Sequence, residues 1–306
     1  MKFRVKGKLG PGFGRSHLAF SSNKNPGVYE GVAWEGEAML SVGLLGVFRI
    51  ASVDNRSWSE LGPAGRGLAS FLFTYPGRPH RRERLADLFW PELEPERARR
   101  AFNSAIWRFR KLLATEPENA DGEGVQTVGL ETVLAPAPWL DIDVSALHEA
   151  ATLVLKQPVA LQQAETLNSV TAVLERYEGP FLDGDDGDWI LQERERLHSL
   201  FLRTATLVVC RLGLAERYDD AIRLARLALR FDPYREELVR TLITLLALDE
   251  RRCEAVQYYN SWSKSLKAEL DIGPLPATRK VLYDIRALDG ADGFRALRAR
   301  LEGMRV

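Results

Sequence analysis

Residues 97–111 concentrate positive charge. The segment holds six basic residues and no acidic one: Arg97, Arg99, Arg100, Arg108, Arg110 and Lys111. An arginine guanidinium group donates two hydrogen bonds to guanine, an asparagine amide pairs with adenine, and further cations neutralise phosphates. If these side chains share one exposed face, double-stranded DNA is the partner that this chemistry suits.

An apolar pattern in the same segment indicates which side chains are exposed. Over 95–114 the spacing of three and four residues predicts a helix, whose buried stripe is Ala98, Phe102, Ala105, Ile106, Phe109 and Leu113. At about 100° per residue, the side chains opposite or beside that stripe are Arg100, Asn103, Ser104, Trp107, Arg108 and Lys111. Together with Arg97 and Arg110 they form the candidate DNA-binding face. The alternative is a basic face that is only solvated.

Two tryptophans accompany this face. Trp107 would expose its indole there, and two interpretations stand equally: packing against a neighbouring hairpin, or contact with a sugar or phosphate of DNA. Trp90 ends an earlier helical pattern just before Pro91. We expect its ring to anchor a helix corner in the core, with the indole N–H free to donate to a phosphate.

The elements around the basic helix follow the order of a winged helix-turn-helix domain. They are strands at 44–50 and 58–61, helices at 66–75, 81–90 and 95–114, and, after an acidic loop at 115–124, a hairpin of strands at 125–128 and 132–134. In such domains the third helix enters the major groove. This position favours DNA binding over a merely solvated face.

Beyond Pro138 the chain is predicted to be nearly all helix. Ala221 and Ala255 lie 34 residues apart in the matching contexts YDDAI and RCEAV. That period is typical of tetratricopeptide repeats, which stack helix pairs because one pair cannot bury its apolar face alone. The predicted helices are at 189–213, 217–231, 235–249, 252–270 and 276–288. The fold class is therefore mainly α: a winged helix-turn-helix domain followed by an all-α, tetratricopeptide-like repeat domain.

The formal net charge of zero is a cancellation between segments. Residues 39–111 carry +6 and residues 112–187 carry −12, so the first segment favours an anionic partner.

No apolar run reaches the roughly 20 residues that span a bilayer, and no signal peptide is recognisable. We expect a cytoplasmic protein with no membrane partner, in which Cys210 and Cys253 are small buried residues.

The pattern divides the chain into four regions. Residues 1–38 read as a disordered leader, and a purine-rich coding run before Met39 suggests that translation starts there and that the leader is absent from the native protein. The winged helix-turn-helix domain spans 39–138, the helical repeat domain 139–290 and a C-terminal helix 291–306.

Catalysis and metal binding have no motif to support them. The glycine-rich segments at 10–14 and 62–67 lack the strand context or the lysine of a phosphate-binding loop. The four histidines are scattered and share no metal-ligand spacing with the cysteines. We therefore expect no enzyme activity, no catalytic or metal-binding residue and no cofactor.

Several segments resemble one known family. Residues 44–48, 76–91 (PGRPHRRERLADLFWP) and 105–113 (AIWRFRKLL) are similar to the OmpR-type winged helix of the Streptomyces antibiotic regulatory protein (SARP) family. Residues 177–182, 188–190, 193–197, 232–238 (DPYREEL) and 269–278 (ELDIGPLPAT) are similar to that family's bacterial transcriptional activator domain. The resemblance covers about 41–288, and the second set of motifs is the more specific.

The resemblance implies a sequence-specific activator that binds promoter repeats and recruits RNA polymerase through its sigma factor. It also implies that Arg100, Asn103, Ser104, Trp107, Arg108 and Arg110 lie on the recognition helix and that Trp90 lies near a phosphate. Two features depart from the family. The wing at 125–134 contains Glu131 and no Lys or Arg, so we expect no strong minor-groove contact from it. We also expect the protein to lack the ATPase or sensor domain of larger members.

The predicted function is thus transcriptional activation through double-stranded DNA, with the repeat domain forming a homodimer or contacting polymerase. The alternative is a helical-repeat protein scaffold or sensor without DNA binding. The dependence of DNA affinity on salt concentration separates the two functions. If the protein neutralises six phosphates, its affinity for DNA falls with about the 5.4th power of salt concentration.

Overall fold

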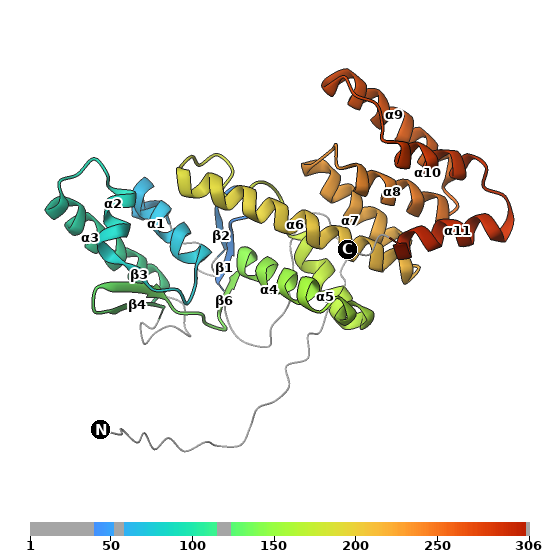
Figure 1. The fold of residues 1–306 in the computed structure, drawn as a ribbon. Helices are drawn as coiled ribbons and strands as arrows, with labels where there is room; N and C mark the ends of the chain where they lie inside the picture. Colours follow the sequence, from blue (N-terminus) through green and yellow to red (C-terminus); the bar gives the residue numbers. More distant parts are fainter. Residues whose placement is uncertain (1–39, 52–57, 115–123, 304–306) are drawn as a thin grey trace, which may run out of the picture.

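The computed structural model describes residues 40–51, 58–114 and 124–303, arranged as Figure 1 shows. The predicted leader and Met39 lie outside these residues, as does most of the acidic loop at 115–124. The described residues form a winged-helix part followed by an elongated helical part, which confirms the predicted fold class.

The winged-helix part combines helices with two small sheets. Its elements are β1 (Leu40–Gly43), β2 (Arg49–Ala51), the 3-10 helix η1 (Trp58–Leu61), α1 (Gly62–Thr74), β3 (His80–Arg81), α2 (Arg82–Phe89), α3 (Pro95–Leu113), β4 (Val125–Val128) and β5 (Glu131–Leu134). The wing sheet has the order β3-β5-β4 and is antiparallel. The other sheet has the order β2-β1-β6, and β6 (Leu140–Ile142) pairs with β1 in parallel.

The stripe predicted for the third helix is confirmed. The buried residues of α3 are Ala98, Phe102, Ala105, Ile106, Phe109 and Leu113. The ring of Phe109 packs edge-on against Phe73 of α1, with centroids 5.2 Å apart, and against Trp58 of η1 at 6.0 Å. These aromatic contacts fix which face of α3 turns away from the core.

Two strand predictions near the N-terminus are wrong. The apolar run at 44–50 is not one strand, because β1 ends at Gly43 and the chain turns at Gly46, whose φ is +124°. Leu44 and Leu45 are fully buried in that turn. Residues 58–61 form η1 instead of a strand, and this places Trp58 against the aromatic core.

The helical part continues to the end of the described chain. Its elements are α4 (Asp143–Lys156), the 3-10 helix η3 (Pro158–Gln162), α5 (Ala164–Glu175), α6 (Asp188–Leu214), α7 (Tyr218–Phe231), α8 (Glu236–Leu248), α9 (Arg252–Leu270), α10 (Pro276–Arg286) and α11 (Gly290–Gly303). The five predicted helices correspond to α6 to α10. α6 to α9 pack in succession, and Ala221 and Ala255 are both fully buried, as a stack of helix pairs requires.

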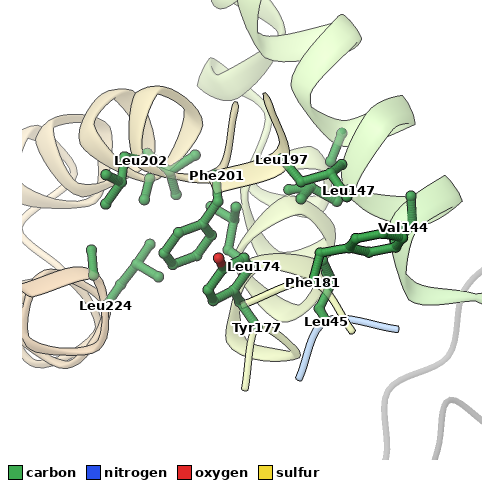
Figure 2. Close-up of a cluster of buried hydrophobic side chains, with 14 of the residues drawn as sticks. Leu45, Val144, Leu147, Leu174, Tyr177, Phe181, Leu197, Phe201, Leu202 and Leu224 are labelled. Atoms are coloured by element: carbon green, nitrogen blue, oxygen red, sulfur yellow. The ribbon is translucent and has the colours of Figure 1, made fainter. Parts of the chain in front are cut away.

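Large side chains fill the centre of this part (Figure 2). Tyr177 stacks on Phe201 with ring centroids 3.9 Å apart, and both rings are buried. Leu45, from the turn after β1, lies beside Phe181 in the same cluster. The winged-helix part thus contributes an apolar residue to the core of the helical part.

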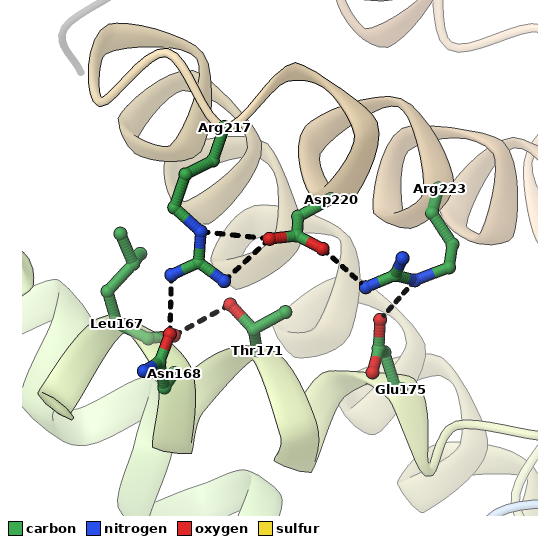
Figure 3. A network of polar contacts seen from close by, with 7 residues as sticks. All are labelled: Leu167, Asn168, Thr171, Glu175, Arg217, Asp220 and Arg223. Carbon is green, nitrogen blue, oxygen red and sulfur yellow. Dashed lines mark hydrogen bonds and ion pairs between the residues drawn. The ribbon is translucent and has the colours of Figure 1, made fainter. Parts of the chain in front are cut away.

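A polar network on the surface joins α5 to α7 (Figure 3). Arg217 and Arg223 both donate to Asp220 of α7, and they reach across to Asn168 and Glu175 of α5. Burial alone would raise the pKa of Asp220, but the hydrogen bonds from the two arginines lower it below the usual value. The network supplements the apolar contacts that hold these two helices together.

A buried carboxylate connects the two parts of the molecule. Asp143, the first residue of α4, accepts hydrogen bonds from the backbone N–H of Leu44, at 2.8 and 3.0 Å, and of Leu45, at 2.8 Å. Burial raises the pKa of Asp143 to about 6, although these hydrogen bonds and one from Val144 oppose the shift. The turn after β1 is therefore held directly by the start of the helical part.

One described helix, α6, is long and apolar enough to cross a membrane by length and composition, but 61% of its apolar window is buried inside the fold. That burial marks it as the central helix of a packed domain.

Cys210 on α6 is buried as predicted, whereas Cys253 is exposed at the start of α9, so the prediction for Cys253 is wrong.

Candidate nucleic-acid interface

The helix-turn-helix corner is formed by α2, Trp90 and α3. α2 packs against α3 and ends where the Trp90 N–H donates to the Ala86 carbonyl at 2.9 Å. The half-buried Trp90 ring packs edge-on against Phe102, with centroids 6.5 Å apart. α3 then begins at Pro95, which suits a first-turn position because its missing N–H would have no partner there.

The structure brings most of the predicted DNA-binding residues onto one exposed face of α3. The exposed members are Arg97, Arg100, Asn103, Ser104, Trp107, Arg108 and Lys111. Trp90 and Arg110 are half-buried. In Figure 1 this helix lies at the end of the molecule farthest from α9 and α10, so its outer side is accessible to a long double helix.

Four cations on this face lack a carboxylate partner among the described residues. The Arg100 Nε donates to the Glu96 carbonyl at 3.3 Å, and Arg108 lies 3.5 Å from the Glu60 carbonyl. The other two are Arg97 and Lys111. Arg99 differs, because it lies 3.6 Å from Glu83 and 3.4 Å from Glu96. The α3 face therefore carries uncompensated positive charge suited to phosphates.

Trp107 is largely exposed on α3. Its side chain is 62% exposed, and the Lys111 ammonium lies 5.5 Å from the centre of its ring. Such a contact contributes about 0.5–1 kcal/mol at an exposed site. The exposed indole thus lies beside a cation on the α3 surface.

Arg110 is directed into the fold and not outward. Its Nε donates to the Val125 carbonyl at 2.8 Å, and its other nitrogen donates to the Thr127 hydroxyl at 2.5 Å. Burial, together with the nearby Arg82 charge, lowers the pKa of Arg110 from its usual value. Arg110 ties α3 to β4 of the wing, so this geometry gives it a positioning role.

The wing projects beside α3 and ends in apolar residues. β4 and β5 turn at Gly129, whose φ of +60° favours glycine. At the tip, Val128 and Leu130 are 67% and 70% exposed. The exposed residues at the tip are therefore apolar.

One contact at this site has no signal in the sequence. Arg82, the first residue of α2, donates to the side-chain oxygen of Asn103 at 2.5 Å. The two residues are 21 positions apart and on different helices, so no periodicity links them.

Among the described residues, no group of three or more His, Cys, Asp or Glu side chains could hold a metal ion.

The described residues thus combine a winged helix, whose third helix carries uncompensated positive charge, with stacked helix pairs. The family model of the bacterial transcriptional activator domain matches residues 142–286. These residues begin at the end of β6 and extend through α10. They are therefore a bacterial transcriptional activator domain.

The fold is also shared with a solved structure, "Mycobacterium tuberculosis EmbR in complex with low affinity phosphopeptide". The match has a TM-score of 0.63 and 22% sequence identity and covers 87% of this chain and 70% of that one. A search of curated proteins finds no match. The family model thus agrees with the predicted activator domain over residues 142–286, and the solved structure agrees with the predicted fold.

Proposed function

We propose that the protein binds double-stranded DNA through the exposed face of α3 and activates transcription from the bound promoter. The observation that carries the proposal is the set of four cations on α3 that have no carboxylate partner among the described residues: Arg97, Arg100, Arg108 and Lys111. Asn103, Ser104 and Trp107 lie among them and supply amide, hydroxyl and indole groups for base or sugar contacts.

The helical part supports the second half of the proposal. A bacterial transcriptional activator domain at 142–286 is the natural contact for RNA polymerase and its sigma factor, and it is also the candidate surface for a homodimer on repeated sites. In this proposal the protein acts in the cytoplasm as a regulator, not as an enzyme.

The first experiment selects bound sequences from a random duplex pool with the full chain and then measures affinity against salt concentration. If each of the four cations neutralises one phosphate, the logarithm of the affinity should fall with log salt at a slope of about −3.6. Each Arg→Ala or Lys→Ala change at the four positions should reduce that slope by about 0.9.

A matched control is Arg295→Ala on α11, because that exposed arginine already pairs with Asp292 at 2.6 Å. It should leave both affinity and salt slope unchanged. Failure of the wild-type chain to retain any duplex at low salt would reject DNA binding and favour the scaffold alternative. Transcription in vitro from a selected site, with and without the protein, tests polymerase recruitment separately.

A further inference from the structure

Three elements hold Arg82 at the junction of α2, α3 and the wing. Its backbone N–H donates to the Leu130 carbonyl of the wing turn at 3.0 Å. Its guanidinium carbon lies 5.7 Å from the centre of the Phe102 ring of α3. Its terminal nitrogen is 2.5 Å from Asn103 Oδ1. The guanidinium group therefore lies against an asparagine of the candidate reading face.

This contact determines how the Asn103 amide is turned. An asparagine side chain has an oxygen that accepts and a nitrogen that donates, whereas an arginine only donates. Asn103 must therefore direct its oxygen toward Arg82. Its NH₂ group is the part left to face a ligand in front of α3.

The orientation matters because the usual reading of adenine needs both ends of the amide. The oxygen accepts from the adenine amino group while the nitrogen donates to N7. With one of the two lone pairs of the oxygen engaged by Arg82, the NH₂ group is the end of the amide that stays fully available. Guanine presents two adjacent acceptors, N7 and O6, in the major groove, so an amide that turns its NH₂ group toward the base suits guanine better.

The positive charge around Asn103 also favours guanine over adenine. Arg82 lies close enough to Arg110 for its positive charge to lower the pKa of Arg110. Arg82, which contacts Asn103 directly, thus places a positive charge on this side of α3. Its positive potential disfavours the amino group of adenine and favours the oxygen of guanine.

We propose that Arg82 is a specificity-determining residue that locks Asn103 as a hydrogen-bond donor and so directs it to guanine in place of adenine. This inference rests on the proposed function, since it assumes that α3 lies in the major groove. Arg82 acts through Asn103 and is a positioning residue, whereas Asn103 makes the base contact.

The test is selection from a random duplex pool with the full chain and four variants. Wild type should prefer guanine at one position, and Asn103→Ala should erase the preference at that position alone. Asn103→Asp keeps the acceptor for Arg82 but loses the donor, so it should also lose guanine. The expected discrimination is at least about fivefold.

The Arg82 variants separate positioning from direct contact. Arg82→Ala frees the Asn103 oxygen and should move the preference at that position from guanine to adenine. Arg82→Lys retains a donor and a charge and should keep guanine. Both keep the backbone N–H that bonds to Leu130, and thermal melting of each variant reports whether it folds.

Three results would overturn the proposal. The first is an unchanged base preference in Arg82→Ala. The second is a wild-type preference for adenine at the position that Asn103→Ala affects. The third is a uniform loss of affinity in Arg82→Ala with a salt slope lower by about 0.9, which would mean a phosphate contact. If the wild-type protein retains no duplex at all, the proposed function itself has failed.

Discussion

At the scale of single residues, neighbouring basic side chains on α3 have different tasks. Arg108 and Lys111 point to solvent, whereas Arg110 between them donates to Val125 and Thr127 of the wing. Arg99 is neutralised by Glu83 and Glu96. The number of phosphates that α3 can neutralise is therefore set by these side-chain contacts and not by the number of basic residues.

The tie made by Arg110 leads to a stability prediction. Arg110→Ala removes two hydrogen bonds from a charged, half-buried donor, so the free energy of unfolding should fall by about 1–3 kcal/mol. Urea denaturation measures this loss, and hydrogen exchange in β4 should speed up. Lys111→Ala is the control and should change stability by less than about 1 kcal/mol. An unchanged stability combined with a lower salt slope would show that Arg110 contacts DNA.

The raised pKa of Asp143 leads us to expect that the stability of the protein depends on pH. Its pKa is about 6 in the folded protein, because burial disfavours the charge, and 3.8 is the ordinary value that applies when unfolded. Between these values the folded state binds more protons, so this group's contribution to stability is present below about pH 4 and is lost as pH rises through about 6. The loss amounts to roughly 3 kcal/mol.

Urea unfolding of wild type and Asp143→Asn from pH 4 to 7 checks this sign. The variant cannot ionise, so the stability difference in favour of wild type should be larger at pH 4 than at pH 7. The Asn amide also turns a donor toward the N–H groups of Leu44 or Leu45, which should destabilise the variant at every pH. A difference that grows with pH would contradict the raised pKa.

The sequence predicts the role of a residue well when that role depends on residues close to it in the chain. The buried stripe of α3 follows from helical periodicity, and all six residues were predicted. The engagement of Arg110 with the wing and of Arg82 with Asn103 depends on tertiary contacts 15 to 21 positions away. Nothing in local spacing encodes them, so seven residues of the candidate face are exposed as expected, whereas Arg110 is half-buried and neither positioning contact is predicted.

At the scale of elements, the N-terminal end of α6 joins the winged-helix part to the helical part. Trp189 packs edge-on against Phe71 of α1, with centroids 5.1 Å apart, and against Phe181 at 5.9 Å. The hydroxyl of Tyr75, just after α1, donates to the buried Glu193 of α6 at 3.2 Å. One helix thus contributes to both cores, as its central position in Figure 1 indicates.

Trp189→Ala should therefore weaken the connection between the two parts. We expect a loss of about 1–3 kcal/mol, below that of a fully buried tryptophan, because Trp189 is half-buried. Scanning calorimetry should show the winged-helix part melting first, separately from the helical part. The control is Leu191→Ala, since Leu191 is 48% exposed on the same helix. A single unchanged transition in Trp189→Ala would show that the interface contributes little.

The errors in element prediction have a common physical cause. The apolar run at 44–50 resembles a strand, but its buried leucines bond to Asp143 and Phe181 lies against the same turn. A strand pairs along its length, whereas here the partners come from helices and loops about 100 to 140 positions later. Long helices with a full apolar period, α6 to α10, were predicted because their pattern is local.

At the scale of the whole molecule, charge is distributed so that DNA has one preferred approach. The segment 39–111 carries +6 and contains α3, while 112–187 carries −12 and leads from the end of α3 into α4 and α5. An acidic flank repels phosphates and a local basic patch attracts them. We expect this arrangement to favour a defined docking orientation over uniform coating of DNA.

The last prediction concerns the connection between the two parts. β6 pairs with β1 although it lies beyond residue 138, where the composition places the domain boundary. The turn at 44–46 also exchanges hydrogen bonds with Pro180 and Leu182. A fragment of residues 40–138 would lose β6, Asp143 and these partners, leaving the apolar Leu40, Val42 and Leu44 exposed at a sheet edge that can pair with other chains.

We therefore expect the 40–138 fragment to melt at a lower temperature than the winged-helix part of the full chain and to self-associate on concentration. Light scattering and circular dichroism measure the two effects. Because duplex DNA contacts only α3 in our proposal, any folded fraction should still bind DNA, with the same salt slope. A fragment as stable as the full chain would mean that the sheet shared between the parts adds nothing to the stability of the winged-helix part.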